Sequence, residues 1–150
     1  MKIEQAINQT KPFTTAYEKL IVNMIYTSTW LAARQKELLA RYSLTMKQYN
    51  ILRILRGAGT PISTAEIRKR MLDKMSDASR IVDRLEKKDF VIKRVCSEDH
   101  RKVDILITDK SLEVLKQIDR VMPSWQASLL DVSYDEAEQL SDLLDKLRGG

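Results

Sequence analysis

One change of hydrophobic period near the middle of the chain limits what this sequence can fold into. Before Phe90 the apolar residues recur mostly at helical spacing, whereas the short run from Phe90 to Cys96 is rich in β-branched residues. After the polar segment 97–102, every second residue from Val103 to Ile107 is apolar and β-branched. Two short alternating runs around a charged tip indicate a β-hairpin. We therefore predict a mainly helical fold that contains one small hairpin.

Helix start signals divide the rest of the chain into six predicted helices. The first spans about residues 13–42 and repeats its apolar positions nearly every seven residues, which is typical of a helix that packs along another long helix. Ser76 is the expected N-cap of the fourth helix. Pro123 is expected to kink or interrupt the fifth, which begins near residue 108. Capping boxes predict the starts of the other three helices: Thr45 with Gln48, Ser63 with Glu66, and Ser133 with Glu136.

The positive charge is concentrated in the middle of the chain. Residues 1–46 carry 6 basic and 3 acidic side chains, and residues 47–102 carry 15 basic and 8 acidic ones. Residues 103–150 reverse the balance, with 5 basic and 10 acidic side chains. The middle segment thus has a net charge of +7, although the whole chain has only +5. A localised positive field of this kind favours a polyanionic partner.

The third and fourth predicted helices form a helix-turn-helix, and the hairpin that follows them forms a wing. In this arrangement one helix crosses the DNA backbone while the next enters the major groove. Base-edge contacts are predicted for polar residues of the fourth helix: Ser76, Asp77, Ser79, Arg80 and Arg84. Phosphate contacts are predicted for basic residues around it: Lys69, Arg70, Lys74, Lys87 and the wing residue Lys102.

The sequence also excludes several classes of protein and site. The single cysteine, Cys96, excludes an intrachain disulfide framework, and the single histidine, His100, excludes a metal site built on several histidines. We expect no cofactor and no catalytic activity, because the chain offers neither a Gly-rich phosphate loop nor an evident carboxylate pair. No apolar run approaches the roughly 18 residues of a membrane span, and the N-terminus lacks a signal-peptide pattern. We therefore expect a cytoplasmic protein that has no membrane partner.

Two stretches of the chain carry a resemblance to a known family. Residues 79–91, SRIVDRLEKKDFV, are similar to the recognition-helix stretch of the MarR family of winged-helix transcriptional regulators. The run Asp99-His100-Arg101, followed by VDILIT at 103–108, resembles the family's wing. The resemblance extends over essentially the whole chain in length and helix order. Asp89 departs from the family, which usually has Gly there, and the first helix lacks the cysteine of the redox-sensing branch.

The resemblance implies a single domain, 1–150, in which residues 45–108 form a winged helix-turn-helix lobe that binds DNA. Residues 1–42 and 109–150 would supply the dimerisation helices. A homodimer of this kind binds a pseudo-palindromic operator in double-stranded DNA and regulates transcription, in the expected case as a repressor. In the wing, the family pattern implies that Arg101 enters the minor groove and that Asp99 holds it. His100 and Lys102 would complete the DNA-binding tip.

Many members of the family release DNA when a small phenolic or lipophilic molecule binds between the dimer helices and the DNA-binding lobes. Tyr26 and Trp30, one turn apart on the first helix, and Tyr49 are candidates for the pocket of such an aromatic or lipophilic effector. Their alternative role is as core or dimer-interface residues. Cys96 is expected to be a buried structural thiol in the wing strand.

Two other functions remain open at this stage. The first is a protein-interaction adaptor that has the winged-helix fold and does not bind DNA. The polar, basic face of the fourth helix argues against it. The second is an enzyme, for which the sequence offers little material.

Overall fold

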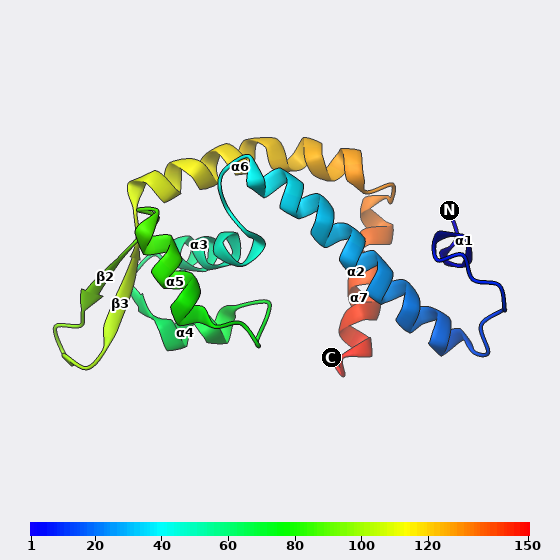
Figure 1. Cartoon of the computed structure of the whole chain (residues 1–150), viewed down its shortest axis with the longest axis horizontal. Coiled ribbons are helices and arrows are strands. Elements are labelled where there is room, and N and C mark those ends of the chain that lie inside the picture. The colour runs from blue at the N-terminus through cyan, green and yellow to red at the C-terminus, as the bar shows by residue number, and fades with distance from the viewer. The chain divides into compact units, whose positions relative to one another are not determined.

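The computed structural model describes residues 1–150 and divides them into two compact units, 1–111 and 112–150. Nine of the ten elements begin in the first unit, and helix α6 continues from the first unit into the second. Helices account for most of the chain, and the three strands form one small sheet (Figure 1). The mainly helical fold with a β-hairpin is therefore confirmed.

Helix α2 (Ala16–Ala40) is the long first helix that the sequence predicts. It begins later than the predicted range 13–42, because Thr15 is its N-cap and accepts a hydrogen bond from the backbone N–H of Glu18 at 3.1 Å. It also ends sooner than predicted. A short helix, α1 (Ile3–Ala6), precedes it and was not predicted. Much of the apolar surface of α2 is exposed in the single chain. The exposed side chains on one face of α2, the α2 apolar face, are Tyr17, Leu20, Ile21, Ile25 and Leu31.

Helix α3 (Met46–Ala58) begins and ends where the sequence predicts. Thr45 and Gln48 form the reciprocal capping box, with each side chain accepting from the other residue's backbone N–H at 3.1 Å. Gly59 ends the helix at a φ of +67°, in the left-handed region that glycine adopts without a steric penalty. The helix buries residues on more than one side, as predicted, and forms much of the core.

Helices α4 (Thr64–Arg70) and α5 (Ala78–Lys87) follow, and α5 packs an apolar stripe into the same core. The stripe repeats at i, i+3, i+4 and i+7, and all of its members are buried: Ala78, Ile81, Val82 and Leu85. Two residues after the end of α5, Asp89 has a φ of +60°. An aspartate adopts this conformation at some cost where a glycine would not. Thr108 Oγ1 donates to the Asp89 carbonyl at 2.8 Å and so ties this turn to the end of the hairpin.

The sheet contains the predicted hairpin and one further strand. Strands β2 (Val91–Val95) and β3 (Val103–Ile107) pair antiparallel in the register Val95↔Val103 and Val91↔Ile107. Strand β1 (Ile62–Ser63) pairs with the other edge of β3, which gives the order β1-β3-β2. Its two residues were predicted only as the start of a helix. The hairpin tip projects away from the helices of the first unit (Figure 1).

Helix α6 (Asp109–Leu129) continues through Pro123, so of the two predicted effects, a kink or an interruption, the interruption does not occur. Proline has no N–H to donate to the preceding turn. At this point Ser124 Oγ donates to the Val121 carbonyl at 3.0 Å. Helix formation on both sides of the proline thus outweighs the loss of one backbone hydrogen bond.

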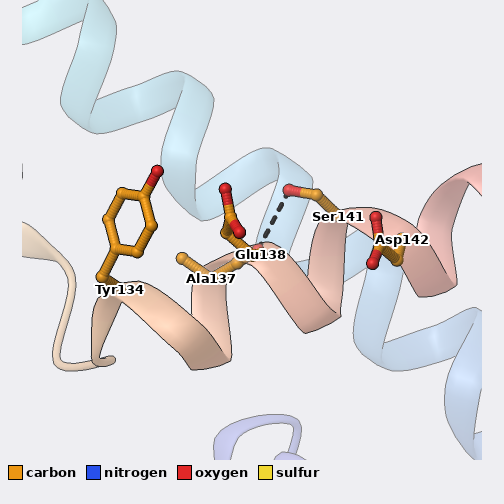
Figure 2. A pocket seen from close by; sticks show the side chains of 5 residues that line it. All are labelled: Tyr134, Ala137, Glu138, Ser141 and Asp142. Atoms are coloured by element: carbon orange, nitrogen blue, oxygen red, sulfur yellow. Dashed lines mark hydrogen bonds between the residues drawn. The ribbon is translucent and has the colours of Figure 1, made fainter.

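Helix α7 (Tyr134–Leu147) starts at the predicted capping box of Ser133 and Glu136. One face is largely polar, and Figure 2 shows its shallow hollow with the Ser141 hydroxyl bonded to the Ala137 carbonyl at 3.0 Å. The opposite side carries a stripe of exposed leucines, the α7 apolar stripe: Leu140, Leu143 and Leu147. None of the helices combines the length and the apolar character needed to cross a membrane.

Candidate nucleic-acid interface

Helix α4 begins at Ser63, but only half of the predicted capping box forms. Ser63 Oγ accepts from the Glu66 backbone N–H at 3.1 Å. The Glu66 carboxylate bonds to Arg70 instead of returning to the cap, with an Nη2–Oε1 distance of 3.0 Å. The hydrogen bond from Arg70 holds the pKa of Glu66 below its usual value. Lys69 lies 3.6 Å from the same carboxylate, and both basic side chains remain exposed at the end of α4.

The turn between α4 and α5 is fastened to α3. Asn50 Oδ1 accepts from the Leu72 backbone N–H at 3.0 Å, and Lys47 forms an ion pair with Asp73 at 3.1 Å. Asp73 Oδ1 also accepts from the Met75 backbone N–H at 3.0 Å. These anchors could not be predicted from the sequence, since an asparagine and a lysine on a helix give no signal for contacts with residues more than 20 positions away. The predicted phosphate ligand Lys74 is exposed in this turn and donates to the Lys69 carbonyl.

The start of α5 corrects the predicted N-cap by one residue. Asp77 is the cap, and its carboxylate accepts from the Arg80 backbone N–H at 3.2 Å. Ser76 is only 7% exposed, so its side chain does not lie on the solvent face where a base contact was predicted. The other four predicted base-reading residues are exposed: Asp77, Ser79, Arg80 and Arg84.

The acidic residues of α5 pair with a lysine outside the helix, while Arg80 Nε lies 3.9 Å from the carboxylate of the N-cap Asp77. Lys93 on β2 bonds to Asp83 and lies 3.8 Å from Glu86. The hydrogen bond to Asp83 raises the pKa of Lys93. Arg84 and Lys87 form no ion pair, so α5 presents uncompensated positive charge.

The wing tip brings together the two residues that the sequence pairs there. Asp99 Oδ1 accepts from the backbone N–H of Arg101 at 3.0 Å and from its Nε at 3.2 Å. These two bonds, the backbone bond first, hold the pKa of Asp99 below its usual value. The Arg101 side chain is nevertheless 92% exposed, and His100 and Lys102 are exposed beside it. The tip therefore presents a guanidinium whose direction is restrained by Asp99.

Cys96 differs from its prediction as a buried thiol. It is half-buried and lies one residue beyond the end of β2, where its backbone N–H donates to the Lys102 carbonyl at 2.8 Å. Side chains near the tip of a two-stranded hairpin have too few neighbours to be fully covered.

Tyr49, one of the three candidate effector residues, lines a pocket in the first unit. This pocket has a volume of about 270 Å³ and lies between α3 and the turn before α5, with Tyr49 and Arg53 in its wall. The Arg53 guanidinium lies 5.8 Å from the centre of the Tyr49 ring. Tyr26 and Trp30 do not line it. The other lining residues are Gln35, Met46, Lys47, Asn50, Met71, Leu72 and Asp73.

Comparison with known proteins agrees with this arrangement. Residues 44–103 match the MarR family model. A MarR transcription factor from Planctomyces limnophilus is 23% identical, with a TM-score of 0.67, over 93% of this chain and 100% of that one. BpsR from Bordetella bronchiseptica, whose DNA binding is regulated by 6-hydroxynicotinic acid, is 17% identical, with a TM-score of 0.78, over 93% and 99%.

A mutant of E. coli MarR solved in complex with operator DNA is 22% identical, with a TM-score of 0.75, over 89% of this chain and 99% of that one. At these identities the structural matches establish the fold, and the family model covers the helix-turn-helix and most of the wing hairpin. Members of this family are transcription regulators and not enzymes. Residues 44–103 of the chain, which include the helix-turn-helix, thus match the MarR family model, and the chain has the fold of solved MarR-family regulators.

Proposed function

We propose that the chain is a sequence-specific regulator of transcription that binds double-stranded DNA as a homodimer and represses a pseudo-palindromic operator. The proposal rests on one observation: α5 has basic side chains without an acidic partner, and the wing has an exposed arginine. Lys93 neutralises Asp83 and Glu86, while Arg84 and Lys87 have no acidic partner. Phosphates supply the missing counter-charge, and their neutralisation releases counterions from the duplex.

The lobe formed by residues 45–108 acts as the DNA-binding part. The role of each exposed residue in this lobe follows from its position. The N-terminal part of α5 enters the major groove, where Arg80 and Arg84 have the donors to bond guanine O6 and N7. Asp77 and Ser79 contact neighbouring base edges. Basic side chains around this helix bind phosphates and fix the register: Lys69, Arg70, Lys74, Lys87 and Lys102. Arg101, restrained by Asp99 and flanked by His100, enters the adjacent minor groove.

The homodimer forms through residues 1–42 and 109–150. The α2 apolar face and the α7 apolar stripe support this assignment, because a soluble chain rarely exposes so many large apolar side chains without a partner. Ile25 is 63% exposed and Leu143 is 62% exposed in the single chain. Two copies then place two lobes on half-sites roughly one helical turn of DNA apart. The dimer works in the cytoplasm, where its DNA partner lies.

A small aromatic or lipophilic effector releases the dimer from its operator. The pocket beside Tyr49 supports this part of the proposal, since Met46, Met71 and Leu72 give it an apolar wall and Arg53 a charged one. An occupant would lie against the turn that Asn50 and Lys47 hold in place before α5. Tyr26 and Trp30 then serve at the dimer interface.

The proposal is tested by selecting bound fragments from the source genome and repeating the selection with candidate aromatic acids and phenols. Arg101→Ala should weaken binding to all selected fragments, whereas Arg80→Ala should also reduce the preference for the selected sequence over others. Lys116→Ala, which removes an exposed charge from α6, is the matched control and should bind as the wild type does. Absence of any retained fragment at low salt would contradict DNA binding and favour the adaptor function.

A further inference from the structure

The turn before α5 exposes a large apolar side chain at the end of the proposed recognition helix. Met75 is 93% exposed, and it stands two residues before the N-cap Asp77. Ser76 between them is buried, so the chain alternates outward, inward and outward as it enters the helix. Met75 and Asp77 are therefore both accessible to solvent next to the start of α5.

Backbone contacts hold Met75 in a defined place. Its N–H donates to Asp73 Oδ1 at 3.0 Å, and the other carboxylate oxygen of Asp73 lies 3.1 Å from Lys47 Nζ on α3. Asn50, also on α3, accepts a hydrogen bond from the backbone N–H of Leu72, the residue before Asp73. The turn is thus anchored at several points, and its position relative to the first turn of α5 varies little. These contacts reduce the backbone entropy that the turn loses when it meets a ligand, while the Met75 side chain keeps its three rotatable bonds and can adapt to an apolar group.

We propose that Met75 reads a thymine in each half-site by packing against its C5-methyl group. This inference rests on the proposed function and adds a specificity determinant to it. The thymine methyl is the apolar group that base pairs present in the major groove, where the start of a recognition helix is inserted. The other exposed residues at the start of α5 are polar: Asp77, Ser79 and Arg80. Met75 is the apolar side chain of this surface.

Leu72, the other exposed apolar residue of the turn, lines the pocket beside α3 and therefore does not serve as a control. Ile92 on β2 is a suitable control, because it is an apolar side chain that is 54% exposed and it does not line that pocket.

The experiment removes one methyl group at a time from the DNA. A duplex is selected by the wild-type protein from a random-sequence library, and each thymine in a half-site is replaced by deoxyuridine, with the same change in the other half-site. Binding is measured by fluorescence anisotropy for the wild type, Met75→Ala and Ile92→Ala. Burial of one methyl group contributes about 0.8 kcal/mol, so we expect wild-type affinity to fall about fourfold per half-site at one position.

Met75→Ala should lose about the same affinity on the thymine duplex and show no further loss when that thymine becomes deoxyuridine. Ile92→Ala should keep the full methyl dependence. Thymine dependence that persists unchanged in Met75→Ala, or a selected duplex in which no replacement weakens wild-type binding, would overturn the inference and leave the proposed function intact. Failure of the wild type to select any duplex would overturn both. Thermal melts should be the same for all three proteins, because both substituted side chains are exposed.

Discussion

The α7 apolar stripe allows a quantitative test of the proposed homodimer through Leu143→Ala. Complete burial of a leucine contributes about 1.5–3 kcal/mol. Leu143 is 62% exposed in the single chain, which leaves about 1–2 kcal/mol to be gained at an interface. A two-fold symmetric interface contains the residue twice, so the substitution should cost about 2–4 kcal/mol of dimerisation free energy. The dimer dissociation constant should then rise by about 30- to 700-fold.

Sedimentation equilibrium over a dilution series measures this constant directly. The substitution should leave α7 folded, because alanine is the best helix former, so circular dichroism should not change. Leu72→Ala is the control, since it removes the same side chain from the turn before α5 and should leave the dissociation constant as it is. A Leu143→Ala protein that dimerises as tightly as the wild type would refute the assignment of the stripe. A wild type that stays monomeric at micromolar concentration would refute the homodimer itself.

Three further predictions concern stability and reactivity. The pKa of Lys93 is raised in the folded protein, chiefly by its hydrogen bond to Asp83. The stability that charged Lys93 gives to the folded protein is therefore complete below the pKa of the unfolded chain, near 10.5, and is lost as the pH rises through the pKa of the folded protein. Thermal melts between roughly pH 9 and 12 should show the wild type losing its advantage over Lys93→Met, and parallel curves would contradict the ion pair. Thr45→Ala removes an N-cap and should lower the free energy of unfolding by about 1 kcal/mol in urea titrations, whereas Thr60→Ala, outside any cap, should not. Because Cys96 is half-buried, Ellman's reagent should modify one thiol per chain without denaturant, and protection until unfolding would contradict its position.

Local signals predicted most of the helix starts. Thr45, Ser63 and Ser133 each accept from the backbone N–H three residues later, as the sequence indicates. The error at α5 arose because Ser76 and Asp77 are both good N-caps and are adjacent. Burial of Ser76 decided between them, and burial depends on tertiary packing that local rules do not include. At α4, the charge of Arg70 attracted Glu66 away from the cap.

Predictions failed where distant residues decide the outcome. Strand β1 has only two residues, and its existence depends on pairing with β3 some 40 positions later. Helix α6 tolerates Pro123 because both flanking segments are long enough to remain helical. Anchoring of the α4–α5 turn by Asn50 and Lys47 joins elements more than 20 residues apart, and no periodicity signals such a contact. Contacts between such distant residues can be identified only in the folded chain.

In the proposed DNA-binding surface, residue types carried more information than exact positions. The basic residues of α5 and the Asp99–Arg101 pair lie where the sequence placed them, because a short amphipathic helix and a hairpin tip have few alternative arrangements. The candidate effector residues Tyr26, Trp30 and Tyr49 stay a prediction. Aromatic residues on one helix, Tyr26 and Trp30, gave no indication of the cavity beside Tyr49, which α3 and the following turn form together.

The salt dependence of binding to the selected operator tests the central claim most directly. If the winged lobes of two chains neutralise phosphates, the logarithm of the affinity falls steeply and linearly with the logarithm of the salt concentration. Arg101→Ala should then reduce the slope by about one unit for each wing, and Lys116→Ala should leave it unchanged. Binding that is insensitive to salt, or a slope that is the same in Arg101→Ala and the wild type, would contradict DNA recognition by this lobe and its wing.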